Sequence, residues 1–130
     1  MYPNQQQTQQ SQLGVAKSST TAGLLGIFLG SVGAHDFYLG YKKMGIIHVV
    51  LLVVSIILII VSGALAVGAA TNPYSYLDGS VGSKVSAGLV LGGIGWVVMA
   101  GNGLWGFVTG IMVFAKSGKY GRDANGTPLV

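Results

Sequence analysis

The chain contains no cysteine and carries little charge. Without cysteine there is no disulfide framework, no thiolate metal site and no thiol chemistry, and the redox compartment is left open. Charged residues make up 8% of the sequence, whereas hydrophobic residues make up 51%. Because a soluble domain carries about 25% charged residues, this composition predicts an integral, multi-pass membrane protein whose first partner is the lipid bilayer.

The sequence also lacks the signatures of catalysis and of nucleic-acid binding. At 130 residues, most of them in apolar segments, it leaves no room for a separate soluble enzyme domain. We find no nucleophile–base arrangement, P-loop or phosphate cradle, and therefore expect no enzymatic activity and no cofactor. The net charge of +4 comes from basic residues at the ends of the apolar segments, which fits membrane orientation better than nucleic-acid binding.

What is present divides the chain into three consecutive parts. Residues 1–16 form a glutamine-rich tail that we expect to be disordered. Residues 17–115 form the membrane domain, and 116–130 form a basic C-terminal tail. The membrane domain contains three apolar segments and one polar loop, namely 20–36, 44–70 and 87–115, with the loop at 71–86.

Two of these apolar segments, 44–70 and 87–115, are uncharged and long enough to span a bilayer as helices. Segment 20–36 is too short to do so. The sequence therefore predicts an all-α membrane protein with two long transmembrane helices and a short N-terminal membrane-embedded helix or re-entrant hairpin. If segment 20–36 instead crosses fully, the seven basic residues divide five against two between the sides, whereas if it enters and returns they divide six against one. Both forms make the C-terminal tail cytoplasmic and loop 71–86 extracytoplasmic, since cytoplasmic segments carry the excess of Lys and Arg.

Glycine is abundant, with 22 residues, and in the first and last apolar segments it recurs at steps of three or four. In lipid, small residues at this spacing let helix backbones approach closely. Asn102 lies at the edge of the last stripe and is suited to an interhelical hydrogen bond. The predicted helix-packing residues are Gly26, Gly30, Gly88, Gly92, Gly95, Asn102, Gly103, Gly106 and Gly110.

A polar turn follows the first apolar segment, and its motif residues are Gly33, His35, Asp36, Phe37, Tyr38 and Gly40. One interpretation is that these polar side chains have a structural role and order the turn through local hydrogen bonds, because buried polar groups are normally satisfied locally. The other is a proton- or ion-binding site, because ionisable groups inside a membrane are often functional. His35, Asp36 and His48 offer a metal site on paper, but their spacing matches no standard motif, so no metal is predicted.

The residues of this turn, with the glycine-rich runs on either side, resemble the TM2 domain family, which is named for its two transmembrane helices. The resemblance covers about residues 17–50 and, more weakly, 92–115. It implies an architecture more than an activity, because the family is mostly of unknown biochemical function. This chain has Asp36 where the family usually has Arg, and Thr109 where it usually has Asp. A salt bridge between those two family positions therefore cannot be carried over.

The sequence favours a helix-packing and interaction module that associates with a second copy of itself or with another membrane protein. The glycine faces and the lack of catalytic residues support this hypothesis. The alternative is an oligomeric ion or proton channel that uses His35, Asp36, His48 and Asn102. The channel requires a ring of subunits, because one chain of this size is too small to enclose a path.

Overall fold

The computed structural model describes residues 15–130, so the glutamine-rich tail predicted at 1–16 lies almost wholly outside the described residues. Within these residues the regular structure is helical, with one isolated antiparallel bridge between Arg122 and Pro128. The all-α fold is thus confirmed. In chain order the elements are α2 (Ser19–Leu29), the 3-10 helix η1 (Gly30–Val32), α3 (Ala34–Leu39), α4 (Lys42–Thr71), α5 (Pro73–Leu77), α6 (Val81–Phe114) and the 3-10 helix η2 (Gly118–Gly121).

The two long helices, α4 and α6, contain 30 and 34 residues. At 1.5 Å per residue they extend about 45 and 51 Å, more than the roughly 30 Å of a hydrocarbon core. Both are long and apolar enough to cross a membrane, which confirms the two predicted spans. Because they exceed the core thickness, each helix either tilts or continues beyond it.

The segment predicted as loop 71–86 is largely helical. Asn72 ends the first span and caps α5, because its side-chain Oδ1 accepts a hydrogen bond from the Tyr74 N–H at 3.0 Å. Pro73 then occupies the first turn of α5, where its missing N–H is harmless. The second long helix begins at Val81, six residues before the predicted 87. Its first turns are polar, so the apolar pattern used to place its start does not detect them.

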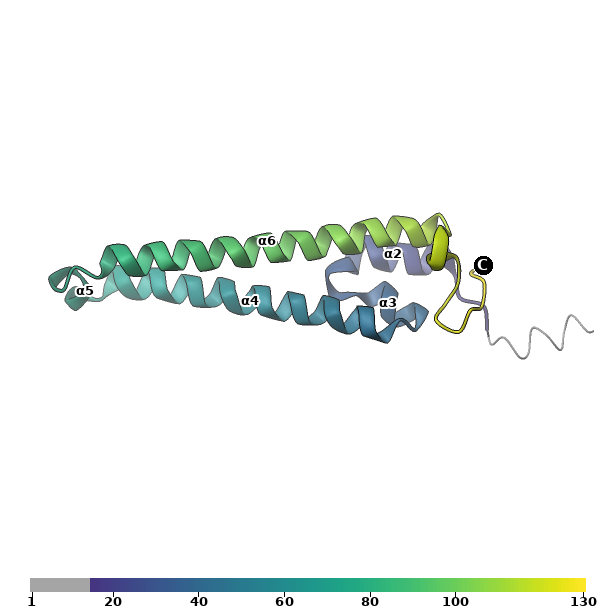
Figure 1. Ribbon diagram of the computed structural model, residues 1–130, viewed down its shortest axis with the longest axis horizontal. Helices are drawn as coiled ribbons and strands as arrows, with labels where there is room; N and C mark the ends of the chain where they lie inside the picture. The colour runs from purple at the N-terminus through teal and green to yellow at the C-terminus, as the bar shows by residue number, and fades with distance from the viewer. Residues whose placement is uncertain (1–14) are drawn as a thin grey trace, which may run out of the picture. The chain divides into compact units, whose positions relative to one another are not determined.

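The chain forms two compact units, and α4 and α6 contribute to both. The second unit, Val50–Asn102, is a helical hairpin in which α5 connects α4 to α6 (Figure 1). Its two helices touch at glycines of α6: a Cβ added at Gly88 would lie 3.0 Å from the Ser62 carbonyl oxygen, and one at Gly95 would lie 3.0 Å from the Ser55 carbonyl oxygen.

The first unit comprises the described residues up to Val49 together with Gly103–Val130. In it α2 and α3 lie beside the start of α4 and the end of α6 (Figure 1). Gly33 and Gly40 adopt φ values of +71° and +87°, which side chains other than glycine rarely tolerate. The chain reverses direction after α2. A hydrogen bond from the Ser18 N–H to the Tyr38 hydroxyl, at 3.2 Å, joins the residue that precedes α2 to α3. Helices α2 and α3 therefore form a hairpin.

The C-terminal residues, which the sequence analysis treated as a basic tail, fold back onto this hairpin. The Ala124 N–H donates to the Leu39 carbonyl at 2.8 Å, and the Ser19 N–H donates to the Val130 carbonyl at 2.9 Å. Tyr41 donates its hydroxyl hydrogen to the carbonyl oxygens of Lys119 or Arg122, at 3.1 and 3.0 Å. The small apolar core of this unit consists of Ala22, Leu39, Val113, Tyr120 and Leu129.

Candidate functional site

Close contacts between α2 and α6 build one wall of the site in the first unit. A Cβ added at Gly30 would lie 2.6 Å from the carbonyl carbon of Gly106, and one at Gly110 would lie 2.7 Å from that of Gly26. These distances are far below ordinary van der Waals contact, so both backbones approach where only glycine fits. Four of the predicted packing residues thus meet in two pairs between α2 or η1 and α6.

The polar side chains of the turn converge inside this unit. His35 and Asp36 come from α3, and His48 comes from the second turn of α4. The Nε2 atoms of both histidines lie 3.5 Å from the Asp36 Oδ2. All three side chains are almost completely buried, with 0%, 1% and 1% of each residue exposed. Two residues of the turn and one residue of the first long helix therefore form one buried cluster.

Helix α6 completes the cluster from the opposite side. The Thr109 Oγ1 lies 2.8 Å from His35 Nε2, within hydrogen-bond distance. The same hydroxyl lies 2.9 Å from the Trp105 carbonyl and 3.0 Å from the Gly106 carbonyl. Which atom donates depends on the tautomer of His35, because the Thr109 hydroxyl can give its hydrogen either to one of these carbonyls or to an unprotonated His35 Nε2. The Trp105 ring contacts the His48 ring, with 4.9 Å between centroids.

The two positions where this chain departs from the family pattern thus lie at the same site. Asp36 and Thr109 are joined through His35, which contacts both. In this chain His35 therefore lies between the two positions, 3.5 Å from the Asp36 Oδ2 and 2.8 Å from the Thr109 Oγ1. The sequence analysis identifies Thr109 only as a departure from the family pattern, and no local signal connects Thr109 or Trp105 to the turn.

Hydrogen bonding within the cluster is incomplete. Among the described residues, the Asp36 Oδ1 and the His35 Nδ1 have no hydrogen-bond partner although both atoms are buried. No Lys or Arg among residues 15–130 forms an ion pair with Asp36. A buried carboxylate is costly unless it is paired, and the ion-pair partners of Asp36 among the described residues are two histidines, which are charged only when protonated. The cluster can therefore bind a proton or a cation. Its three ionisable residues each offer a ligand atom within 4.8 Å of the others.

The remaining predicted residues are divided between the two units. In the first unit, the Phe37 ring packs against Gly45, where an added Cβ would lie 2.8 Å from the ring. A Cβ added at Gly103 would lie 3.1 Å from the Ser31 hydroxyl oxygen. In the second, Gly92 packs against Ser62, and Asn102 is 2% exposed. Of the motif residues, the structure therefore brings His35 and Asp36 into the cluster, and Asn102 lies in the other unit.

Two tyrosines lie where the C-terminal residues cover the start of α4. Burial raises the pKa of Tyr41, partly offset by the nearby Lys119 ammonium. Burial also raises the pKa of Tyr120. Both phenols are therefore protonated at neutral pH, which keeps Tyr41 available as a hydrogen-bond donor. The Lys119 ammonium lies 4.9 Å from the centre of the Tyr120 ring, a cation–π distance.

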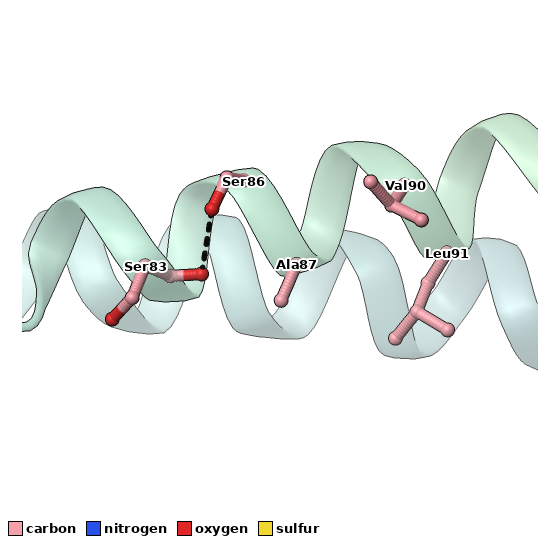
Figure 2. A pocket seen from close by; sticks show the side chains of 5 residues that line it. All are labelled: Ser83, Ser86, Ala87, Val90 and Leu91. Carbon is pink, nitrogen blue, oxygen red and sulfur yellow. Dashed lines mark hydrogen bonds between the residues drawn. The ribbon is translucent and has the colours of Figure 1, made fainter.

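A shallow groove in the second unit offers no comparable chemistry. Its volume is about 450 Å³, and Figure 2 shows that its lining residues follow one another along a single helix. Its only polar groups, Ser83 and Ser86, are joined by a hydrogen bond from the Ser86 hydroxyl to the Ser83 carbonyl at 3.0 Å. A groove on one helix face without convergent polar groups is a surface depression rather than a substrate site.

Comparison with known proteins supports the resemblance seen in the sequence. Residues 16–64 match the family model of the TM2 domain. The match covers the hairpin of α2 and α3 and most of α4, and it confirms the predicted family resemblance for this part of the chain. No significant match was found among curated proteins or among solved structures.

Proposed function

We propose that this small membrane protein, with its TM2 domain, acts as a helix-packing and interaction module. Its partner is a membrane helix, supplied by a second copy of the chain or by another membrane protein. No catalytic step is part of this function. The two spans and the family match establish the membrane setting, and the interaction role rests on the distribution of glycine along α6.

One glycine face of α6 is already used inside the chain, whereas a second one is open. Gly88, Gly92 and Gly95 pack against α4 within the second unit, but a Cβ added at Gly93 or Gly101 would meet nothing within 4 Å. The two open glycines lie on one face of the helix with Val97 between them, four residues from each. This open small-residue face is the observation that carries the proposal, because such faces bring membrane helices together.

The exposure of the intervening side chain supports this interpretation. Val97 is 73% exposed in the single chain, so the face is accessible over its whole length. A contrasting face exists on α4 at Ile57, which is 53% exposed. The residues one turn away from Ile57 are Val53, Val54, Ile60 and Val61, and none of them is glycine, in contrast to the residues one turn from Val97. Lipid chains cover such a face well, whereas a second helix cannot approach it closely.

The test is site-specific photocrosslinking in native membranes, with the photoreactive residue placed at Val97 and, as the matched control, at Ile57. We expect discrete protein adducts from position 97 and only lipid adducts from position 57. An adduct of twice the chain's mass identifies a second copy as the partner, and any other discrete mass identifies a different protein. Gly101→Leu should remove the adduct at 97. Lipid adducts alone at both positions would refute the proposal.

The channel alternative receives no comparable support. Three of its four residues, His35, Asp36 and His48, are buried inside the first unit, and Asn102 is buried within the second. A ring of subunits would need polar groups on an exposed face of the chain to line its path. All four side chains are buried in the single chain instead.

A further inference from the structure

We propose that His35, Asp36 and His48 bind a divalent transition-metal ion of the Zn²⁺ type, in a site that connects α3 to α4. The inference goes beyond the interaction role and does not depend on it. The ligand types fit, because imidazole and carboxylate bind Zn²⁺ and related ions. The chain has no cysteine, so a thiolate site for a softer ion is excluded.

The distances in the cluster support coordination better than hydrogen bonding. Each histidine Nε2 lies 3.5 Å from the Asp36 Oδ2, beyond the 2.7–3.2 Å range of N–H···O hydrogen bonds. Two ligand atoms bound about 2.0–2.1 Å from one tetrahedral ion are about 3.3–3.4 Å apart. The two measured separations therefore match two edges of a tetrahedral site.

The widest separation among the three ligand atoms shows how far the site would have to contract to bind an ion. The ligand atoms of the three residues all lie within 4.8 Å of one another. Two nitrogens bound to the same Zn²⁺ are at most about 4.1 Å apart, twice the metal–nitrogen distance. A rotation of one imidazole that shortens the widest separation by about 0.7–1.5 Å completes the site.

The surroundings of Asp36 provide an independent reason for a cation. This carboxylate is 1% exposed, its Oδ1 has no hydrogen-bond partner among the described residues, and no Lys or Arg of residues 15–130 pairs with it. Buried charges are normally paired or coordinate a metal. Coordination through His35 Nε2 uses the lone pair of that nitrogen, so the ion would replace the hydrogen bond between Nε2 and the Thr109 Oγ1, which lies 2.8 Å away.

The test uses the full chain in detergent, with a purification tag that contains no histidine, after treatment with a chelator. Zn²⁺ is titrated by calorimetry and Co²⁺ by visible absorption. We expect one ion per chain and the intense bands of tetrahedral Co²⁺. The chain has only two histidines, so imidazole coordination observed in this preparation reports this site. Zn²⁺ should also raise the melting temperature.

Two conservative variants remove ligands while keeping side-chain shape, namely Asp36→Asn and His48→Gln. Each should weaken Zn²⁺ binding more than about 100-fold, because loss of an outer-shell partner alone typically costs 10–100-fold. The matched control is Asp78→Asn, which removes an exposed carboxylate from the second unit and should leave binding unchanged. Circular dichroism verifies that the variants remain helical.

The proposal is overturned if the unmodified chain shows no saturable binding of one ion. It is also overturned if Co²⁺ gives no tetrahedral bands, or if both ligand variants bind as tightly as the control. The first two readouts need no variant, so a variant that fails to fold does not prevent a decision. Loss of metal binding would leave the crosslinking pattern at Val97 unaffected, so the two proposals are tested separately.

Discussion

A single methyl group placed at Gly110 should destabilise the first unit measurably. In Gly110→Ala the new Cβ would lie 2.7 Å from the Gly26 carbonyl carbon and 2.8 Å from the Ile27 nitrogen. Ordinary contact begins at about 3.4 Å, so the two backbones must separate by about 0.7 Å, the difference between 3.4 and 2.7 Å. The neighbouring atoms are backbone atoms, so no side chain can rotate away to relieve the contact.

The expected cost follows from the behaviour of overpacked interiors, where one extra methyl or methylene group typically costs 1–3 kcal/mol. The matched control is Gly101→Ala on the same helix, where an added Cβ meets nothing within 4 Å. Alanine is the better helix former by up to about 1 kcal/mol in either position. Comparing the two variants cancels this gain, and we expect Gly110→Ala to be less stable than Gly101→Ala by about 1–3 kcal/mol.

The measurement is the free energy of unfolding in mixed micelles, followed by circular dichroism as the denaturing detergent fraction rises. Two variants that agree within about 0.5 kcal/mol, the usual scatter of neutral surface changes, would show that the backbones of α2 and α6 are not in contact. Such a result would also remove the wall that positions the polar cluster.

Three further predictions concern topology, the C-terminal residues and ion flux. Single cysteines placed at Ser11, Ser80 and Ser117 are treated with an impermeant thiol reagent in intact cells. Only position 80 should be labelled, because both ends of the chain are expected to be cytoplasmic. Labelling at position 11 would show that the first segment crosses the membrane fully. Tyr41→Phe should lower stability by about 1 kcal/mol, the net worth of a hydrogen bond, and increase hydrogen exchange around η2; unchanged exchange there would contradict the contact. Purified protein in liposomes should conduct neither protons nor cations, and Asp36→Ala should lower the melting temperature of the protein. A measurable flux that Asp36→Ala abolishes without a loss of stability would favour the channel.

The long spans were predictable because their signal is local and strong. Uncharged apolar runs at 44–70 and 87–115 correspond to α4 and α6 within a few residues, apart from the polar start of α6 at Val81. The spacing of the glycines at three and four residues also indicates that one face of α6 packs closely against another helix. It cannot indicate which helix covers that face, and the structure shows α4 covering it in the second unit and the α2 hairpin in the first.

The polar cluster was predictable only in part. The sequence placed His35 and Asp36 in a turn, but the approach of His48 and Thr109 depends on contacts between segments far apart in the chain. The folded C-terminal residues escaped prediction for the same reason, because their order comes from hydrogen bonds such as Ala124 to Leu39 rather than from an apolar pattern. Local sequence signals carry no information about such partners.

The long sequence separations in the first unit have a consequence for the order of events during synthesis. The hairpin of α2 and α3 leaves the ribosome first, but His35 precedes its Thr109 partner by 74 residues, and Ser19 precedes the Val130 carbonyl by 111. The α4–α5–α6 hairpin, by contrast, is closed by contacts between neighbouring elements, which form early because their loop-closure cost is small. The hairpin of α2 and α3 therefore lacks its contacts with α6 and the C-terminal residues until the second span has been inserted. In a chain that stalls before α6 is made, His35, Asp36 and His48 are not yet covered by that helix.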